Sequence, residues 1–405
     1  MAPTAPSPSH IVRAHSSSVT TTSFSKDNER IYSGDVTGTV VVTSTRTLRS
    51  IAVWKAHSDG ILGVEELHPW FITHGRDNKL HVWSAVSEPE YIAETAARDE
   101  SLITPDLLYS LDVNALNFCR FSICPNFPKD GYDNPGPSSS SLNNNRCILL
   151  AVPNLVESSL ADVWELPSKE RLHAAIGKNT EEFDVDLGDG RGESKTGILM
   201  TMELFFRKEE GPSSSCDLHL LAGYESGEVV LHRCSTPYWE RSIEGRGWTC
   251  IWRTRQHVES VMAMAISPDK SFALTVSADH LVVRYNLFDV EDKEDRPKFV
   301  KHRIKQVGNG AVVVRDDGRV CGVGGWDGKI RLFSTKTMKP LGTLAYHTKS
   351  CKGLAFAHQI PNDDEFEDAD GMTKEEKDTR NLWLVAGSED HRLSLWQLMS
   401  FRKDA

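Results

Sequence analysis

One short phrase recurs along the chain, and this recurrence restricts the possible folds more than any bulk property does. Residues 74–83 read HGRDNKLHVW and residues 387–396 read GSEDHRLSLW. Shorter copies stand at 277–285 (SADHLVVRY) and 325–333 (GWDGKIRLF). Each copy joins small residues, an acidic tight turn and alternating apolar residues that end on an aromatic side chain. This pattern predicts two β-strands connected by a short turn, repeated along the chain.

The spacing of the repeat indicates its class. His15 and His57 are 42 positions apart (57 minus 15), as are Asp35 and Asp77 (77 minus 35). This interval agrees with the roughly 40–45 residues of a WD40 repeat, which forms one four-stranded blade of a β-propeller. We therefore predict an all-β fold, a seven-bladed WD40 β-propeller in which residues 1–405 form a single domain. The blade cores lie at residues 19–43, 60–83, 112–166, 197–233, 258–285, 310–333 and 350–397.

Four polar positions of the repeat predict a buried hydrogen-bonded network. In WD40 repeats of the class that this phrase resembles, the network joins a His before the first strand, a Ser or Thr in the second strand, the turn Asp and the closing Trp. Such a network stabilises a blade only when every member has its partner. Blade two has the complete set, in which we expect the Asp to accept from the His and from turn backbone: His57, Thr73, Asp77 and Trp83.

The other blades keep parts of this set. Blade five keeps three members and has a Tyr in place of the Trp: His257, Thr275, Asp279 and Tyr285. Blade seven keeps three members and has an Ala at the hydroxyl position: His347, Asp390, Trp396 and Ala386. In blade one, two apolar residues take the places of the hydroxyl and the Trp: Ile31 and Val41. Blades three and four keep only outlines of the pattern: residues 162–164 and 223–227.

Composition and charge exclude several classes of function. The formal net charge is −11, so the surface lacks the excess of Lys and Arg that nucleic-acid phosphates require. No apolar run reaches the length of a membrane-spanning helix, and the N-terminal MAPTAPSPS resembles neither a signal peptide nor a transit sequence. The eight cysteines include no Cys-x-x-Cys pair, which favours reduced thiols over disulfides or zinc ligands. We expect an intracellular protein.

Three stretches interrupt the repeat, and we predict them to be disordered insertions. Residues 125–145 are rich in Pro, Asn, Gly and Ser, residues 178–196 are acidic and Gly-rich, and residues 361–380 hold nine acidic and three basic residues. At the other extreme, the chain ends only nine residues after Trp396 (405 minus 396), which is too short for a further outer strand. We therefore expect residues 9–14 to supply the outer strand of blade seven and so to close the ring.

No motif of catalysis, cofactor binding or metal binding stands out from the repeat. The Gly-rich stretch 322–328 belongs to a strand and a turn, whereas a phosphate cradle needs the N-terminus of a following helix. His68 and His74 have no Cys or carboxylate at metal-ligand spacing, and the chain has no Gly-x-Ser-x-Gly elbow. We expect a protein that is not an enzyme and that binds no cofactor, metal or small-molecule substrate.

Candidate protein-binding residues stand at the turns of the blades. In propellers of this class, the residue before the turn Asp faces the wide end of the ring, where partners bind. Six residues hold this position: Gly34, Arg76, Glu225, Ala278, Trp326 and Glu389. Arg and Trp are residue types that dominate the energetics of protein interfaces. We therefore predict Arg76 and Trp326 as anchors for a partner, with Glu225 and Glu389 as further binding residues.

Beyond the repeat, several segments resemble one family of WD-repeat proteins. Residues 34–38 (GDVTG), 54–57 (WKAH) and 75–78 (GRDN) are similar to the fungal ASTRA-associated WD-repeat proteins, whose animal relative is the G-protein-beta-subunit-like protein. Residues 110–119 (SLDVNALNFC) and 151–154 (AVPN) of blade three fit the same family. Blade three is the more specific region, because WD40 repeats in general do not share these residues.

This resemblance implies a non-catalytic scaffold subunit of the nuclear ASTRA complex, involved in chromatin remodelling and in the maturation of phosphatidylinositol-3-kinase-related kinases. The implied partners are the RuvB-like ATPases, the Tel–Tti cochaperone subunits and the large kinase-related pseudokinase. The implied location is the nucleus, with the cytoplasm as an additional one, and we expect no direct contact with nucleic acid or membrane.

Two other classes of propeller protein are relevant. A heterotrimeric G-protein β subunit would begin with a coiled-coil helix, which Pro3, Pro6 and Pro8 exclude. A substrate receptor of a ubiquitin ligase is the alternative that the sequence leaves open, because adaptor-docking sites are short and variable.

Overall fold

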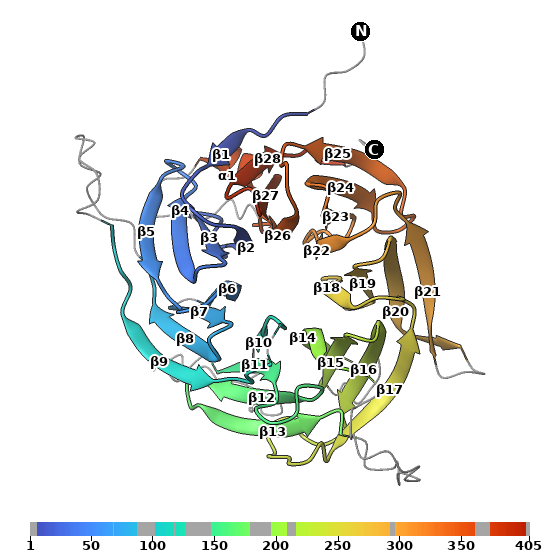
Figure 1. Cartoon of the computed structure of the whole chain (residues 1–405). Coiled ribbons are helices and arrows are strands. Elements are labelled where there is room, and N and C mark those ends of the chain that lie inside the picture. The colour runs from blue at the N-terminus through green and yellow to red at the C-terminus, as the bar shows by residue number, and fades with distance from the viewer. Residues whose placement is uncertain are drawn as a thin grey trace, which may run out of the picture.

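The structure is a ring of small antiparallel sheets. This computed structural model describes residues 6–67, 69–86, 102–116, 118–125, 147–178, 196–208, 216–291, 296–360 and 373–401. Within these residues the chain forms strands β1 to β28 and a single helix, α1. The strands make seven four-stranded sheets, the blades, set radially around a central axis (Figure 1). The predicted seven-bladed β-propeller is confirmed.

The first three blades follow the chain in order from the axis outwards. Blade one consists of β2 (Val19–Phe24), β3 (Arg30–Asp35), β4 (Thr39–Ser44) and β5 (Ser50–Lys55). Blade two consists of β6 (Ile61–Leu67), β7 (Trp70–Gly75), β8 (Lys79–Ser84) and β9 (Leu107–Asp112). Blade three consists of β10 (Ser122–Pro125), β11 (Ile148–Pro153), β12 (Ala161–Leu166) and β13 (Glu170–Ile176).

The next three blades repeat this order. Blade four consists of β14 (Leu199–Lys208), β15 (Cys216–Tyr224), β16 (Glu228–Cys234) and β17 (Trp248–Arg255). Blade five consists of β18 (Val261–Ile266), β19 (Phe272–Ser277), β20 (Leu281–Glu291) and β21 (Arg296–Arg303). Blade six consists of β22 (Asn309–Val314), β23 (Val320–Gly325), β24 (Lys329–Ser334) and β25 (Pro340–Ala345).

Blade seven is built from both ends of the chain. Its inner strands are β26 (Cys351–Phe356), β27 (Trp383–Ser388) and β28 (Leu393–Gln397), and its outer strand is β1 (His10–Val12). β1 pairs antiparallel with β28, with Ile11 opposite Ser394, and Val12 is buried in the cluster between blades seven and one. The N-terminal strand thus stands where the sequence analysis expects it, and it joins the two ends of the ring.

The hydrophobic core lies between the blades. Alternate residues of a strand point to opposite faces of its sheet, and each face packs against the next blade. The contact of blades one and two shows the principle, because Trp54 meets Phe71 and Trp83 edge-on at 5.5 and 5.6 Å between ring centres. Equivalent apolar clusters follow around the ring. A blade therefore depends on its neighbours for burial of its apolar side chains.

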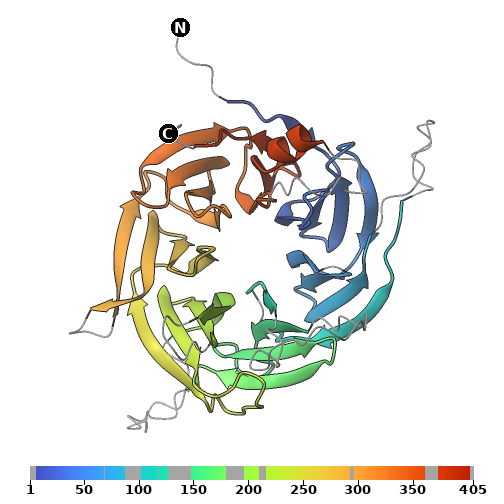
Figure 2. The same ribbon diagram turned by 180° about the vertical axis from the view of Figure 1, so that it is seen from behind.

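The prediction that residues 361–380 form a disordered insertion is wrong in part. Within 361–380, the residues Lys374–Arg380 form α1, which lies on the face of the ring shown in Figure 2, close to blades seven and one. Thr373 caps this helix, since its hydroxyl accepts from the Glu376 N–H while the Glu376 carboxylate accepts from the Thr373 N–H. This reciprocal cap and the burial of Arg380 hold a short, highly charged segment in helical form.

The remaining parts of the predicted insertions, 126–145, 179–195 and 361–372, lie outside the described residues. In the part of the chain that the structure describes, there is no helix with the length and apolar character needed to span a membrane.

Candidate functional site

The polar network of blade two fixes one end of the propeller. The His57 Nδ1–H donates to the Asp77 carboxylate at 2.8 Å, and the Thr73 hydroxyl donates to His57 Nε2 at 2.8 Å. The Trp83 indole N–H then donates to the Thr73 oxygen at 2.8 Å. Burial lowers the pKa of His57, and the neutral ring that results has the one donor and one acceptor that this chain requires.

The turn of blade two is tied to the same network. The Ser58 N–H donates to Asp77 at 2.9 Å. Burial disfavours the charge of Asp77, but the Ser58 N–H and His57 hold the pKa of this carboxyl below its ordinary value. Since Ser58 follows β5 and Asp77 follows β7, the network joins the connection between two blades to the turn between a second and a third strand. Both kinds of loop therefore lie at the same end of the ring.

Blade five forms the network without its Trp. The His257 Nδ1–H donates to Asp279 at 2.9 Å, and Thr275 bonds His257 Nε2 at 2.8 Å. Tyr285 fills the Trp position as a fully buried ring and stacks on Trp252 of blade four at 5.9 Å. A Tyr here supplies apolar contact between two blades.

Blades one and seven differ from the prediction, because in both a Ser supplies the network hydroxyl that the sequence pattern did not identify. In blade one the hydroxyl comes from Ser33, which bonds His15 Nε2 at 2.8 Å while His15 Nδ1 bonds Asp35 at 2.9 Å. Ser33 is two positions after Ile31 on β3 and hence on the same face. The prediction that Ile31 replaces the hydroxyl of blade one is wrong.

In blade seven the hydroxyl comes from the third strand. Ser394 lies directly opposite Ala386 in the pairing of β27 with β28. Its hydroxyl bonds His347 Nε2 at 2.8 Å and accepts from the Trp396 indole N–H at 2.8 Å, while His347 Nδ1 bonds Asp390 at 3.0 Å. The network of blade seven is therefore complete, with the hydroxyl on the neighbouring strand.

The remaining blades hold their turns differently. In blade six, Asp327 pairs with Arg331 at 2.6 Å. In blade three, the buried Asp162 accepts from Asn154 at 2.7 Å and from the Ala175 N–H at 2.9 Å. In blade four, Glu225 accepts from the Ile198 N–H at 3.4 Å. Within the described residues, none of these three carboxylates bonds a His.

Several exposed apolar side chains lie at the end of the ring that carries the networks. We call this end the rim, and it consists of the connections between blades and the turns between second and third strands. Of the exposed large apolar residues that the structure describes, eight belong to the rim: Val36, Leu116, Phe118, Leu155, Val156, Val258, Val307 and Trp326. Three of them, Val36, Phe118 and Trp326, line the same cavity, and a contiguous apolar surface of this kind is typical of protein-binding sites.

Trp326 is held in place by glycine. The backbone N–H of Trp326 donates to the Gly308 carbonyl at 3.0 Å. A Cβ at Gly308 would lie 2.2 Å from the indole ring. Gly308 also has a φ of +87°, a conformation that favours glycine. The indole therefore lies closely over the Gly308 backbone while its side chain stays 43% exposed, so that it is a fixed and accessible apolar surface.

The other three predicted binding residues have different surroundings. The Arg76 guanidinium lies 4.8 Å from the ring centre of Phe118, which is 44% exposed. Glu389 forms an ion pair with Lys352 at 2.7 Å. Arg76, Trp326 and Glu389 all line the central cavity, whereas Glu225 is absent from its lining. The structure thus brings together three of the four candidates, and it adds Phe118, which the sequence analysis missed.

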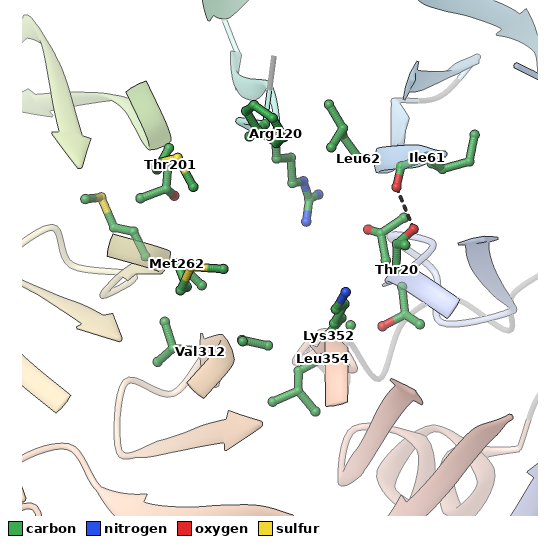
Figure 3. Close-up of a pocket in the computed structure, with 18 of the residues that line it drawn as sticks. Thr20, Ile61, Leu62, Arg120, Thr201, Met262, Val312, Lys352 and Leu354 are labelled. Carbon is green, nitrogen blue, oxygen red and sulfur yellow. Dashed lines mark hydrogen bonds between the residues drawn. The ribbon is translucent and has the colours of Figure 1, made fainter. Parts of the chain in front are cut away.

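The central cavity opens among these rim residues and has a volume of about 870 Å³. Its wall consists largely of the innermost strands of the blades. Arg120 and Lys352 reach into the cavity from different blades, and Met262 and Val312 lie along another side (Figure 3). Blades four and five add further thioethers: Met200, Met202 and Met264. Methionine side chains adapt to partners of different shape, so that this wall suits an inserted protein segment.

The charged groups of the cavity are largely paired. Arg120 bonds Glu65 at 2.8 Å. Burial raises the pKa of the Glu203 carboxyl to about 7, although the Arg120 guanidinium opposes this effect. The Ser122 hydroxyl donates to Glu203 at 3.2 Å. The wall of the cavity therefore combines apolar side chains with polar groups that already have partners.

A cluster near the rim has ligand atoms at metal-binding distances. Ligand atoms of His57, Asp77 and His81 lie within 4.8 Å of one another. Both ring nitrogens of His57 already bond Asp77 and Thr73, and His81 Nδ1 bonds Ser110 at 2.7 Å. A cation would have to displace the network of blade two, so these residues serve the fold.

The ring of seven blades, the buried His–Asp networks and the apolar rim define a WD40 β-propeller. A family model described as "WD domain, G-beta repeat" matches residues 6–44 and 248–286. The chain is 32% identical to ASTRA-associated protein 1 of Verticillium alfalfae, over 98% of this chain and 94% of the relative. This chain belongs to the ASTRA-associated protein 1 family, as the sequence analysis predicted.

More distant relatives extend over the same length. ASTRA-associated protein 1 of Schizosaccharomyces pombe is 26% identical, over 97% of this chain and 99% of the relative. The guanine nucleotide-binding protein subunit beta-like protein 1 of Mus musculus is also 26% identical, over 98% of this chain and 97% of the relative. The fungal and animal proteins that the sequence resembles are therefore both similar to the whole propeller.

Proposed function

We propose that the protein is a non-catalytic scaffold subunit of the nuclear ASTRA complex, and that the rim is the surface on which it holds its partners. The carrying observation is the group of Trp326, Arg76 and Phe118 around the mouth of the central cavity. These are residue types that dominate interface energetics, and backbone and ring contacts hold them in position. The names of the relatives direct the proposal to ASTRA.

The proposed role of the scaffold is in chromatin remodelling and in the assembly and maturation of phosphatidylinositol-3-kinase-related kinases. The proposed partners are the RuvB-like ATPases, the Tel–Tti cochaperone subunits and the large kinase-related pseudokinase. A rim with exposed aromatic side chains and a methionine-lined cavity supports binding of protein segments, and the acidic net charge gives no support for nucleic acid.

The test is co-purification from nuclear extract with a double variant, Arg76→Ala plus Trp326→Ala. Neither side chain belongs to a buried network, so we expect the variant to fold with an unchanged thermal midpoint. Truncation of one anchor residue costs about 2 kcal/mol, and we expect recovery of the kinase-maturation partners to fall by roughly tenfold or more.

The matched control is Trp239→Ala plus Arg246→Ala. Trp239 is 41% exposed and lies in the connection between β16 and β17, away from the rim, and the Arg246 side chain is 72% exposed. This control should recover every partner at the level of the unmodified protein. Full recovery by a folded rim variant would contradict the placement of the binding surface. Recovery of a ubiquitin-ligase adaptor in place of the ASTRA partners would favour the alternative function.

A further inference from the structure

A second pocket lies far from the rim, between blades four and five. It has a volume of about 270 Å³. Two of its residues, His219 and Arg233, are paired with one another across β15 and β16, and Arg233 is paired with Thr249 of β17. Arg207 of β14 is opposite Asp217, at the end of β15 that is remote from the rim turn after Tyr224. The pocket therefore opens toward the end of the ring opposite the rim.

The pocket is closed on the side of blade five by one aromatic ring. Phe288 lies in β20 where the pairing with β21 shifts its register between Tyr285 and Val290. Such a bulge changes the direction of side chains. Phe288 meets His219 edge-on at 5.2 Å between ring centres and Phe205 at 6.4 Å. Packing therefore fixes this ring against blade four.

The Phe288 ring in turn holds the guanidinium group of Arg207. The Arg207 guanidinium lies 3.5 Å from the ring centre of Phe288, which is a close cation–π contact. A guanidinium stacked in this way keeps its N–H groups at the edge, where they can reach an anion bidentately. The stack lowers the entropy that Arg207 would lose on binding, since the side chain is already ordered.

The lining of this pocket contains two guanidinium groups although the whole chain is acidic, and Asp217 stands opposite one of them, Arg207. No described lining residue of this pocket carries a carboxylate. Burial lowers the pKa of His219 to about 4, with Arg233 and Arg207 acting in the same direction against the Asp217 carbonyl and carboxylate. The imidazole is therefore neutral near physiological pH and adds no charge to the two guanidinium groups. The formal net charge of the chain is −11, so a pocket lined by two Arg and no carboxylate differs from the average surface of this protein.

We propose that this pocket binds the phosphate group of a phosphorylated Ser or Thr in a protein partner. Two guanidinium groups and Thr249 line the pocket from three strands, and a phosphate, which has three terminal oxygens, can accept from more donors than a carboxylate with two. The volume fits one phosphorylated side chain and is below that of a site for a drug-sized ligand. This site is separate from the rim and adds a phosphorylation-dependent contact to the scaffold.

The test uses the full chain and a peptide library with one fixed phosphoserine, compared with the same library unphosphorylated. We expect the full chain to retain the phosphorylated library at least tenfold more than the other, and millimolar inorganic phosphate to compete. Arg207→Gln should abolish the preference, and Thr249→Val, a change at an exposed position, should weaken it several-fold. Arg207→Lys should also weaken it, because an ammonium group lacks the bidentate geometry.

Two control variants show whether the preference belongs to this pocket. Arg246→Gln removes an exposed Arg of blade four that does not line the pocket, and it should retain the preference. The rim variant Arg76→Ala plus Trp326→Ala should also retain it, so that failure of the rim proposal and failure of this one are distinguishable. Equal retention of the two libraries, or a preference that survives in folded Arg207→Gln, would overturn the proposal. Binding of inorganic phosphate without retention of the phosphorylated library would overturn it as well.

Discussion

Blades two and four reach the same four-stranded sheet by different means. Blade two ties its turn to the preceding connection through His57 and Asp77, with Thr73 and Trp83 behind them. In blade four the turn carboxylate is Glu225, which bonds a backbone N–H of the inter-blade connection. The inner strands of blade four are longer, since β14 and β15 have ten and nine residues against seven and six for β6 and β7.

Blade four packs apolar side chains against both neighbours. Leu204 and Leu220 belong to a cluster shared with blade three, and Leu221 and Trp252 belong to a cluster shared with blade five. Strand pairing and apolar burial are therefore sufficient to form a blade. The polar network of blade two adds a fixed rim turn, because its side chains tie that turn to the connection before the blade.

The first test asks how much the pairing of β1 with β28 contributes to stability, and we expect it to give the largest effect. Deletion of residues 1–14 removes β1, exposes the edge of β28 and uncovers the cluster around Val12. Loss of one buried side chain and several backbone hydrogen bonds should lower the free energy of unfolding by roughly 3–6 kcal/mol. Thermal and urea melts measure it, with deletion of residues 1–7 as the control. A melting temperature unchanged by the longer deletion would show that the ring closes without this strand.

The second test compares the networks of blades one and two. The Asp35 carboxylate bonds His15, the Thr37 N–H and hydroxyl and the Thr39 N–H, and it is almost fully buried. We expect Asp35→Ala to cost at least as much as Asp77→Ala, with roughly 1–3 kcal/mol for each buried group left unpaired. Urea denaturation of both variants measures this order. A clearly smaller loss for Asp35→Ala would favour the sequence-based view that blade one has an incomplete network.

A third test concerns the hydroxyl of blade seven. Ser394→Ala leaves His347 Nε2 and the Trp396 indole N–H without partners, and we expect a loss of about 2–4 kcal/mol from the two buried groups. Adding Ala386→Ser to this variant places a hydroxyl directly opposite, and it should restore part of the loss. Denaturant melts of the single and double variants measure both effects. Equal stability of Ser394→Ala and the unmodified protein would contradict the network of blade seven.

A fourth test uses pH. The pKa of Asp35 is lowered to about 2 despite burial, because His15 and Thr37 bond the carboxylate. The unfolded state therefore takes up a proton near the ordinary value of 3.8 while the folded state does not. This contribution, about 2 kcal/mol, is present above that value and is lost as pH falls toward 2. The stability difference between the unmodified protein and Asp35→Asn should shrink over this interval in urea melts. A stability difference that stays constant between about pH 4 and pH 2 would contradict the lowered pKa of Asp35.

The smallest expected effect is in blade four. Glu225→Ala removes a long bond to the Ile198 N–H at an exposed turn, and we expect a change within about 0.5 kcal/mol. The same variant tests the rim, because Glu225 does not line the central cavity and should leave partner recovery unchanged. A loss as large as that of Asp77→Ala would mean that blade four depends on a polar turn after all.

Much of the fold could be predicted because the repeat is local. His57, Asp77 and Trp83 are recognisable at fixed spacing, and the alternating apolar residues that follow the turn specify a strand. The seven blades followed from this pattern, whereas the family followed from a resemblance in segments such as residues 110–119 that the repeat does not explain. The helix Lys374–Arg380 was missed because its charge suggested solvation, although Thr373 and Glu376 carry the spacing of a helix cap.

The hydroxyl groups of blades one and seven were decided by tertiary structure. A hydroxyl serves a His nitrogen from any position on the same face of the sheet, and antiparallel pairing places a residue of the next strand directly opposite. Ser33 and Ser394 use these two routes, and spacing along the chain identifies neither. The rim and the second pocket are decided in the same way. Arg76 lies against Phe118 and Arg207 against Phe288, because the ring brings separate blades into contact.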